Sequence, residues 1–511
     1  MYYPPIEKAL ELAAEYQLIP IRMTFMADQE TPISIFQRLR CNGSFLLESV
    51  EGGTRWARYS FIGLNPLLRL EAKNGEVRVQ YRDRPPLYTA EHPIERLRQE
   101  LQNLRSPDEL DFPRFSGGAV GYFGYDILRY YEDLPEAASD DLKMDDVKFM
   151  FADEVIVFDH LKQEIQVIGH IQVGPEDKPL DIERKYKACC ERIKALARRT
   201  RSTEMTSRDL YVLPTQYDPI EVQSNVTQEE FIQRVKRAKE YIASGDIFQV
   251  VLSQRFMIED VPDPFHVYRV LRSLNPSPYM YFLQFSEEEI LVGTSPELLV
   301  RVEEGKVENR PIAGTRQRGR DSKEDEQLKA DLLADEKERA EHHMLVDLGR
   351  NDIGRVSAYG TVKVEQLMEI EMYSHVMHIV SHVTGRLQKE KDAFDALVSC
   401  FPAGTVSGAP KLRAMEIIAE LENEARNAYA GAIGYFSFSG NMDSCITIRT
   451  IVFKDGRAYI QAGAGIVADS VPVKEFEETE NKAKALIRAI QMAKQIQRLE
   501  EDEEYVSTTA Q

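Results

Sequence analysis

The sequence predicts an α+β protein in which antiparallel sheets pack against helices. Three two-residue turns, each between runs of alternating apolar and polar residues, indicate β-hairpins at Asn74-Gly75, Glu304-Gly305 and Asp455-Gly456. A hairpin joins neighbouring antiparallel strands, whereas parallel strands need a long crossover, usually a helix. Longer helical stretches follow in the last third of the chain. The pattern therefore disfavours a doubly wound parallel sheet.

The 511 residues are enough for two or three domains, and one change in composition divides them. A basic helical stretch ends near residue 202, and a polar segment then leads to the capping box Thr227-Gln-Glu-Glu230, which begins a new helix. A long helix is expected from about Lys474 to Arg498. We predict an N-terminal domain over residues 1–200, a linker over 201–225, a second domain over 226–498 and a tail over 499–511.

Glycines mark two further segments. Gly118-Ala-Val-Gly-Tyr-Phe123 recurs as Gly431-Ala-Ile-Gly-Tyr-Phe436, and we interpret both as sheet strands whose glycines admit a neighbouring backbone. The segment Gly463-Ala-Gly-Ile-Val-Ala468 fits the glycine pattern of dinucleotide-binding proteins. Pro472 interrupts the helix that should follow at once, so this pattern does not indicate a dinucleotide site.

Composition narrows the classes of ligand. Acidic residues number 84 against 64 basic ones, and the resulting net charge of −20 repels nucleic acid and anionic lipid. The chain has no run of about 18 apolar residues that would span a membrane. Its five cysteines, odd in number and without a C-x-x-C pair, are typical of a reducing cytoplasm. We therefore expect a cytoplasmic protein without nucleic-acid or membrane partners.

Two pairs of glutamates could hold a metal ion. Glu338 and Glu341 lie in a helical stretch, and Glu475 and Glu478 begin the C-terminal helix. The spacing of three residues places each pair on one helix face. Carboxylates from two facing helices would suit Mg²⁺, which prefers oxygen ligands. In so acidic a chain the same spacing is common on solvated helix surfaces, and by itself it favours that interpretation.

Three other features suit a small anion or its chemistry. Thr447 and Arg449 share one face of an expected strand over Ile446–Val452, so Arg449 is a candidate clamp for a carboxylate, and a cross-strand ion pair explains it equally well. Gly463-Ala-Gly465 would offer backbone N–H groups in a turn after a strand. His378 is a candidate acid or base.

Seven segments, in this order along the chain, carry a family resemblance. They are Asp246-Ile-Phe-Gln-Val-Val-Leu-Ser-Gln-Arg255, Gly293-Thr-Ser-Pro-Glu297, Pro311-Ile-Ala-Gly-Thr315, Asp335-Glu-Lys-Glu-Arg-Ala-Glu-His342, Asp347-Leu-Gly-Arg-Asn-Asp352, Gly404-Thr-Val-Ser-Gly-Ala-Pro-Lys411 and Gln461-Ala-Gly-Ala-Gly465. With these segments the chain resembles the chorismate-utilising enzymes, and within them the branch that forms anthranilate. The resemblance runs from about Pro20 to Lys494. It implies a sandwich of antiparallel sheets and helices with an N-terminal regulatory region.

The resemblance also implies a metal and a substrate pocket. Mg²⁺ would bridge Glu341 and Glu478 to the ring carboxylate of chorismate, with Glu338 and Glu475 in support. This implication reverses the surface interpretation of the glutamates, and it lets a dianion enter an acidic protein because the metal and Arg449 supply positive charge locally. The implied chorismate contacts are Gly314, Thr315, Tyr429, Arg449, Gly463, Ala464 and Gly465.

The implied reaction is amination of chorismate. Gln249 and Ala313 stand where other branches of the family carry lysines, so the pocket suits ammonia attacking C2 directly. The resemblance implies that Glu297 protonates the departing C4 hydroxyl. His378 and Thr405 would then serve the elimination of pyruvate that yields anthranilate, in the first committed step of tryptophan biosynthesis.

Partners and regulation follow from the same resemblance. None of the cysteines has the G-x-C-x-G-x-Q setting of a glutaminase, so a separate glutamine amidotransferase subunit would supply ammonia. The resemblance implies a heterotetramer, although the residues themselves indicate no oligomeric state. Feedback inhibition by tryptophan would use residues of two segments, namely Leu47, Glu48 and Ser49 with Pro278, Tyr279 and Met280.

Two other functions stay open at this point. The large subunit of aminodeoxychorismate synthase shares almost every motif, and Ala313 together with Leu46-Leu-Glu-Ser49 argues against it. A catalytically silent tryptophan sensor of the same fold is disfavoured because Glu297, His378 and the metal-binding glutamates are intact.

Overall fold

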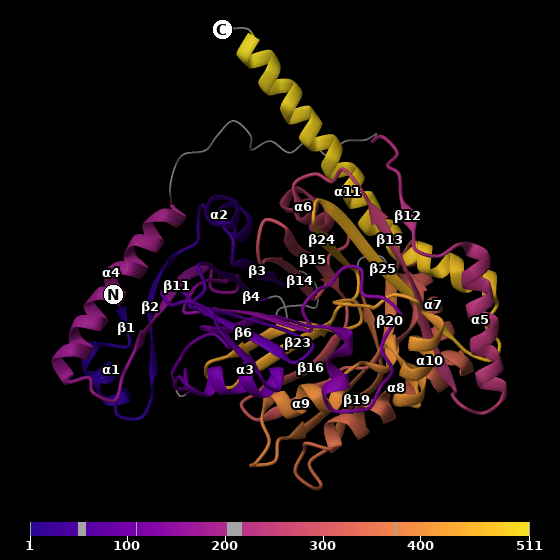
Figure 1. Ribbon diagram of the computed structural model, residues 1–511, viewed down its shortest axis with the longest axis horizontal. Coiled ribbons are helices and arrows are strands. Elements are labelled where there is room, and N and C mark those ends of the chain that lie inside the picture. The colour runs from indigo at the N-terminus through magenta and orange to yellow at the C-terminus, as the bar shows by residue number, and fades with distance from the viewer. Residues whose placement is uncertain (1, 50–57, 109, 202–216, 374–375, 510–511) are drawn as a thin grey trace.

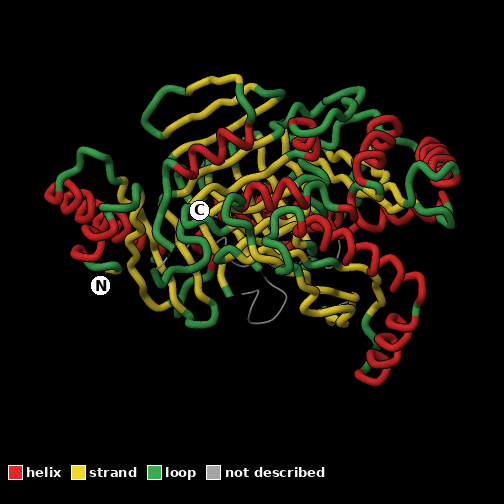
Figure 2. Tube along the Cα trace, turned by 90° about the horizontal axis from the view of Figure 1, so that it is seen from below, coloured by secondary structure: helices red, strands yellow, loops and turns green. Residues whose placement is uncertain are grey.

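The computed structural model shows two large sheets packed face to face, with helices outside them (Figure 1, Figure 2). Strands pair antiparallel throughout both sheets, which confirms the predicted α+β class. The structure describes residues 2–49, 58–108, 110–201, 217–373 and 376–509.

The first sheet takes strands from both halves of the chain, because β3 is hydrogen-bonded to β14. A short strand, β21 (Gly408–Ala409), pairs with β13 beside the main path. In spatial order the other strands are β1 (Tyr2–Tyr3), β2 (Leu18–Met26), β11 (Glu164–Gln172), β10 (Glu154–Asp159), β4 (Tyr59–Gly63), β3 (Ser44–Glu48), β14 (Tyr279–Gln284), β15 (Glu289–Ser295), β24 (Thr450–Lys454), β25 (Arg457–Ile466), β13 (Gln249–Ile258) and β12 (Gln223–Ser224).

The second sheet also joins the two halves, here through the pairing of β22 with β8. One further strand, β19 (Lys363–Met372), pairs with β20. In spatial order the others are β18 (Ile312–Gln317), β20 (Val376–Arg386), β17 (Lys306–Asn309), β16 (Leu298–Glu303), β23 (Met442–Ile446), β22 (Ala432–Ser437), β8 (Gly118–Phe123), β9 (Val147–Ala152), β5 (Leu68–Lys73), β6 (Glu76–Tyr81) and β7 (Leu87–Ala90).

Helices cover the outer faces of the sheets. The first sheet packs against α1, α2, α4, α6 and α11, whereas α3, α8 and α9 cover the second, and α5 and α10 lie on β13. The bounds are α1 (Ile6–Leu12), α2 (Pro32–Leu39), α3 (Pro93–Gln102), η1 (Tyr125–Tyr130), α4 (Pro179–Thr200), α5 (Gln228–Ala243), α6 (Pro264–Leu274), α7 (Ser322–Ala334), α8 (Glu336–Gly354), α9 (Ala393–Cys400), η3 (Gly404–Val406), α10 (Lys411–Leu421) and α11 (Pro472–Thr509).

The interior between the sheets is made of large side chains from both. Phe45 and Tyr281 of the first sheet meet Val120, Met150 and Ile433 of the second, and all five are buried. Full burial of one such side chain contributes about 1.5–3 kcal/mol to folding. Because these contacts link residues from both halves of the sequence, the core depends on the whole chain.

The repeated glycine segments turn out to be neighbours. They form β8 and β22, which pair with Gly121 opposite Gly434. A Cβ on Gly121 would lie 1.9 Å from the carbonyl oxygen of Lys148, and one on Gly434 would lie 2.2 Å from that of Asp443. The interpretation of these glycines as sites of close backbone approach is therefore confirmed.

The predicted hairpins are confirmed, with positive φ at both central residues of each turn, as at Asn74 (51°) and Gly75 (81°).

The predicted domains 1–200 and 226–498 share both sheets, and residues 202–216 of the predicted linker lie outside the described residues. Residues 499–509 of the predicted tail continue α11. No glycine or proline interrupts the sequence after Pro472, so nothing ends the helix earlier.

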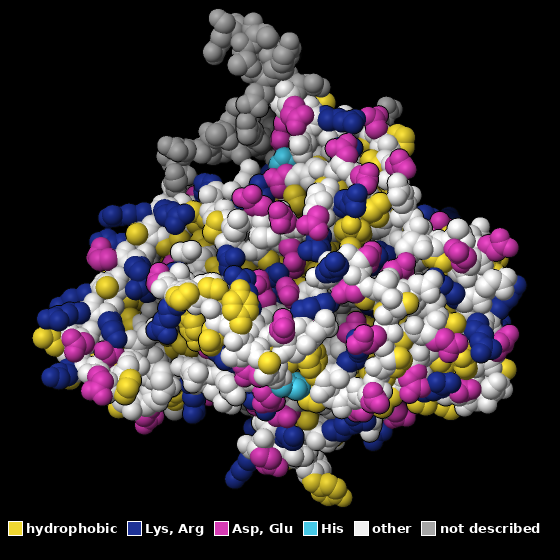
Figure 3. Space-filling model, viewed as in Figure 1, with side chains coloured by type: hydrophobic (Ala, Val, Ile, Leu, Met, Phe, Trp, Pro, Cys, Tyr) yellow, Lys and Arg dark blue, Asp and Glu magenta, His cyan; other side chains and the backbone are white. Residues whose placement is uncertain are grey.

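The surface bears charges of both signs. Figure 3 shows acidic and basic side chains interspersed over one face of the molecule, so the negative net charge is not gathered there into a single field. Among the described residues, no helix has the length and apolar character that crossing a bilayer requires.

Candidate active site

A cavity of about 560 Å³ lies where β13, β18, β20 and β25 approach α8 and α11. Most of the residues predicted for catalysis and substrate binding reach it, although they come from distant parts of the chain. The predicted residues that line it are Glu297, Thr315, Glu341, His378, Thr405, Tyr429, Arg449, Gly463 and Glu478.

Glu297 is poised as a proton donor. It follows β15, and its Oε1 accepts a 2.9 Å hydrogen bond from the hydroxyl of Thr405 in η3. Burial raises the pKa of Glu297 to about 7, and the Thr405 hydrogen bond and the charge of Lys482 oppose the rise. A carboxyl group with this pKa is protonated in part of the molecules at neutral pH, as a general acid must be.

His378 offers a base on the same cavity. Its Nδ1 lies 3.1 Å from the carbonyl oxygen of Gly314 and 3.0 Å from the hydroxyl of Thr315. A carbonyl oxygen only accepts, so we assign the proton to Nδ1, which leaves Nε2 free to take a proton. Burial lowers the pKa of His378, and the ring is therefore neutral at neutral pH.

Two carboxylates face the cavity from two helices. Glu341 projects from α8 and Glu478 from α11. Burial and the neighbouring carboxylates of Glu338 and Glu478 raise the pKa of Glu341, so a cation between the helices would relieve their repulsion. Lys482 Nζ lies 2.7 Å from Glu478 Oε1.

Glu341 and Glu478 supply only part of the ligands that a hard divalent cation requires. Within the described residues, no three His, Cys, Asp or Glu side chains form a metal-binding group. Glu338 and Glu475 are not among the cavity-lining residues, and Glu338 lies 3.5 Å from Arg316 in an ion pair. Glu341 and Glu478 would thus supply two oxygen ligands, and substrate or water the remainder, as Mg²⁺ commonly requires.

Arg449 reaches the cavity by a route different from the one predicted. The expected strand over Ile446–Val452 is wrong: β23 ends at Ile446 in the second sheet, and β24 begins at Thr450 in the first. The chain crosses between sheets at residues 447–449, and Arg449 has a φ of 51°. The alternating pattern continues across this crossing, so the sequence does not reveal it. Arg449 remains beside Tyr429, as a cation facing the cavity.

Gly463-Ala-Gly465 is not a turn but part of β25, paired with β13. Its glycines leave room for neighbours, because a Cβ on Gly463 would lie 2.7 Å from the Tyr429 hydroxyl and one on Gly465 2.8 Å from Gln249 Nε2. Ala464 is buried in the apolar core beneath α5 and α10. Gln249, Gly314, Ala464 and Gly465 are not among the residues that line the cavity in the described chain.

The two segments predicted to bind tryptophan are adjacent strands. In the pairing of β3 with β14, Glu48 lies opposite Met280 and Leu47 opposite Tyr281. Glu48 is buried and accepts hydrogen bonds from Tyr268 (2.6 Å) and Arg272 (3.0 Å).

The pairing of β3 with β14 forms a seam between the two halves of the first sheet, and this seam lies next to the cavity. Tyr279 donates a hydrogen bond of 2.9 Å to Asp443, whereas Pro278 lines the catalytic cavity. Ser49 directly follows β3, at the end of the paired segment. The seam between the halves of the first sheet and the cavity are therefore contiguous.

Sequence reasoning missed several cavity residues. Lys482 bonds Glu478 and donates a 2.8 Å hydrogen bond to the Gly463 carbonyl, and its position four residues after Glu478 on a helix was the available signal. Gln461 also lines the cavity, and its Nε2 donates to Ser253 Oγ at 2.9 Å. Nothing in the local pattern marks Gln461.

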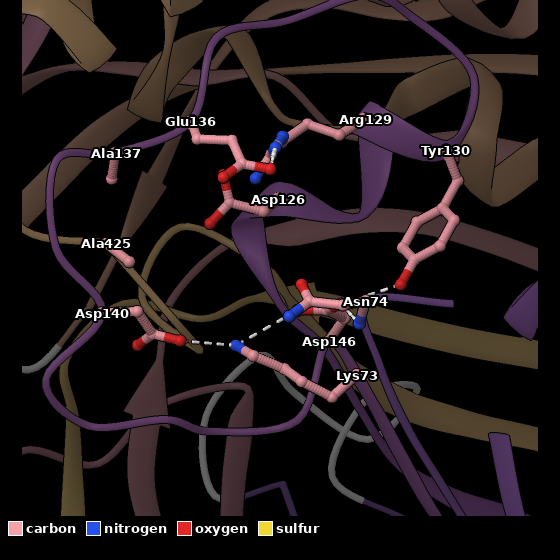
Figure 4. Close-up of a pocket in the computed structure, with 10 residues that line it drawn as sticks. All are labelled: Lys73, Asn74, Asp126, Arg129, Tyr130, Glu136, Ala137, Asp140, Asp146 and Ala425. Carbon is pink, nitrogen blue, oxygen red and sulfur yellow. Dashed lines mark hydrogen bonds and ion pairs between the residues drawn. The ribbon is translucent and has the colours of Figure 1, made fainter. Parts of the chain in front are cut away.

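A second cavity, of about 340 Å³, lies near η1 and carries mainly charged side chains (Figure 4). Lys73 Nζ lies 2.7 Å from Asp140 and 3.5 Å from Asp146. Arg129 pairs with Glu136 across it. Both cations of this cavity are engaged in ion pairs with its carboxylates, and we therefore place no chemistry in it.

Comparisons with known proteins identify the family to which the chain belongs. A family described as chorismate binding enzyme matches residues 43–488, and the chain belongs to that family. The names of individual relatives are more specific than that of the family. "Anthranilate synthase component 1" of Acetivibrio thermocellus is 53% identical over 499 residues, covering 97% of this chain and all of that protein. The protein of the same name in Aquifex aeolicus is 50% identical, covering 96% and 98%.

A solved structure agrees with these relatives. Anthranilate synthase component I from Streptococcus pneumoniae is 39% identical, covers 91% of this chain and 99% of its own, and superposes with a TM-score of 0.74. The fold implied by the sequence resemblance is therefore confirmed.

Proposed function

We propose that the chain is the chorismate-aminating component of an anthranilate synthase. The observation that carries the proposal is the single cavity that joins a proton donor (Glu297), a neutral base (His378), a cation (Arg449) and two carboxylates (Glu341 and Glu478). The relatives named anthranilate synthase component 1 support the same activity, because they match nearly the full chain. Chorismate carries two carboxylates; Arg449 would face one of them, and a cation held by Glu341 and Glu478 would face the other.

Substrate binding precedes the chemistry. Arg449 is placed to hold one carboxylate of chorismate through charge-assisted hydrogen bonds. Glu341 and Glu478 would hold Mg²⁺, with Glu338 and Glu475 one turn away on the same two helices, and the bound cation would supply positive charge for the ring carboxylate. Tyr429 and Thr315 line the walls of the cavity around the ring.

The first step is a substitution with a shift of the ring double bonds. Ammonia forms a C–N bond at C2, and the C4–O bond breaks. Glu297 gives its proton to the departing hydroxyl, which leaves as water. Gln249 and Ala313 supply neither a lysine base for water nor a covalent amine, so ammonia is the available nucleophile.

The second step makes the ring aromatic. Nε2 of His378 takes the proton from C2, and the bond between the ring carbon C3 and the enolpyruvyl oxygen breaks. The departing enolpyruvate takes up a proton at its methylene carbon and becomes pyruvate. Thr405, whose hydroxyl holds Glu297, supports the proton transfer of the first step. The product is anthranilate, and the pathway served is tryptophan biosynthesis.

Ammonia is proposed to come from a glutamine amidotransferase subunit. The relatives are named as one component, which supports the existence of another. The purified chain should convert chorismate with Mg²⁺ and ammonium, and should give no anthranilate with glutamine alone. Robust activity with glutamine alone would contradict a separate glutaminase. A cytoplasmic location is proposed with this assembly.

Mass spectrometry of the products from chorismate, Mg²⁺ and ammonium tests the reaction. We expect anthranilate and pyruvate, and loss of both on addition of EDTA. Accumulation of 4-amino-4-deoxychorismate without pyruvate would instead support the aminodeoxychorismate synthase reaction. Tryptophan binding without turnover would identify a silent sensor.

A further inference from the structure

A buried ion pair beneath the catalytic cavity connects several of its walls. Arg426 and Glu422 are 3% and 5% exposed. Arg426 binds Glu422 in a bidentate manner, from Nε to Oε2 and from Nη2 to Oε1, at 2.7 Å each. Such a planar pair fixes both side chains in orientation.

The remaining hydrogen bonds of Arg426 go to the backbone of two cavity-lining residues. Nη1 donates to the carbonyl of Val406 and Nη2 to that of Val251, both at 2.7 Å. Val251 N donates in turn to the carbonyl of Ser407 at 2.9 Å. The short turn η3 is thus fastened to β13 on both sides, and η3 is the element that carries Thr405.

Glu422 binds the same strand, β13, two residues further along. Its Oε1 accepts hydrogen bonds from the backbone N–H (2.7 Å) and the hydroxyl (2.9 Å) of Ser253. The Ser253 hydroxyl oxygen accepts from Gln461, which lines the cavity. The guanidinium of Arg426 also lies 5.5 Å from the ring centre of Tyr429.

We propose that the Glu422–Arg426 pair is a positioning element for the reaction, which holds the hydroxyl of Thr405 on the carboxyl group of Glu297. The inference rests on the proposed function, because it takes Glu297 as the acid. Neither Arg426 nor Glu422 is among the residues that line the cavity, so the pair acts through η3 and β13 rather than on the substrate. Misplacement of a catalytic group by about 1 Å can cost on the order of 100-fold in rate.

Arg426→Lys is the decisive variant. A lysine keeps the charge but cannot bond Glu422, Val406 and Val251 together. We expect kcat for anthranilate formation with ammonium to fall about 10- to 100-fold, with KM for chorismate changed less than about threefold. If this variant does not fold, Glu422→Asp, which shortens the carboxylate side of the pair, takes its place.

The chain offers a matched control. Arg96 and Glu100 in α3 also form a pair four residues apart, at 2.7 Å, with Glu100 buried, and neither lines the cavity. Arg96→Lys should lower the melting temperature as Arg426→Lys does, without lowering kcat. Equal losses of kcat in both variants would overturn the proposal, because they would show a general effect of weakened folding.

A double-mutant cycle tests whether the Glu422–Arg426 pair acts through Thr405. Thr405→Val alone should lower kcat about tenfold, and adding it to Arg426→Lys should cost less than about threefold more, because the hydroxyl is then already displaced. Losses that multiply would overturn the proposed route through Thr405.

Hydrogen–deuterium exchange keeps the inference separable from the proposed reaction. Amides of residues 404–407 should exchange at least about tenfold faster in Arg426→Lys than in Arg96→Lys. Unchanged exchange there would overturn the positioning role. Absence of anthranilate from the unaltered enzyme, with faster exchange in the variant, would contradict the proposed function while supporting the hold of Arg426 on this turn.

Discussion

Glu297 and His378 share a cavity in which burial favours the uncharged form of both. Burial raises the pKa of Glu297 to about 7 and lowers that of His378 below its usual value. At neutral pH the carboxyl group can therefore donate a proton and the imidazole can accept one. Two groups held in opposite roles by their surroundings are the arrangement that the two proton transfers of the proposed reaction need.

The pH dependence of turnover follows from Glu297. The protonated form acts, so kcat should fall as the pH rises through about 7. The Thr405 hydrogen bond stabilises the carboxylate, and Thr405→Val should raise the pKa of Glu297 and move this falling limb to higher pH. Lys482, the cation acting on Glu297, is unchanged in the variant. Profiles of kcat against pH measure the shift.

Glu297→Gln is the control for that profile. An amide cannot donate a titratable proton, so we expect kcat to drop at least about 100-fold and the limb to disappear. A falling limb at the same pH in the unaltered enzyme and in Thr405→Val would assign the titration to another group.

Ser49 permits a test of regulation. It follows Glu48, whose buried carboxylate accepts hydrogen bonds from Tyr268 and Arg272. Ser49→Ala should relieve inhibition by tryptophan, raising the half-inhibiting concentration at least about tenfold, while turnover without tryptophan stays unchanged. Inhibition curves with ammonium as nitrogen source measure this, and unaltered sensitivity would count against a site at this seam.

The sequence indicated side-chain chemistry better than side-chain surroundings. Glu341, Glu478, His378 and Glu297 were identified from motifs, and the structure places all four on one cavity. Gly465 was predicted to offer its backbone, but only the fold reveals that the missing Cβ makes room for Gln249. Contacts of this kind join residues more than 200 positions apart, and local patterns do not encode them.

At the scale of elements, hairpins were predictable because each is local. The crossing at residues 447–449 was not, because the strand pattern continues while the partner strands change from one sheet to the other. Similarly, the repeated segments around Gly121 and Gly434 indicated two strands, but not that these strands pair with each other.

The pairing of β8 with β9 tolerates no side chain at Gly121. A Cβ there would meet the Lys148 carbonyl at 1.9 Å, so Gly121→Val should lower the free energy of unfolding by about 3 kcal/mol or more, or prevent folding. Gly354→Ala is the matched control, because no atom lies within 4 Å of the added Cβ. Thermal melting of both variants measures the difference in stability, and equal melting temperatures would contradict the tight packing at Gly121.

At the scale of the whole molecule, the two halves depend on each other. A chain of residues 226–511 alone would expose the edges of β14 and β22, which pair with β3 and β8 in the full protein. We expect this half to aggregate or to melt without a cooperative transition. Co-expression with residues 1–225 should restore a soluble complex, whereas cooperative melting of the isolated half as a monomer would contradict this dependence.

The seam of the first sheet has one further consequence. Pro278 borders the space where chorismate is proposed to react, and two residues later Met280 lies opposite Glu48. Successive residues of a strand are about 3.3 Å apart, so the two positions are separated by less than 7 Å. A ligand that displaces β14 along its axis at the seam must therefore displace the cavity wall by a similar amount. If tryptophan binds at the seam as the sequence predicts, β14 alone would connect it to the cavity wall, and inhibition at this distance would require no reorganisation of the rest of the fold.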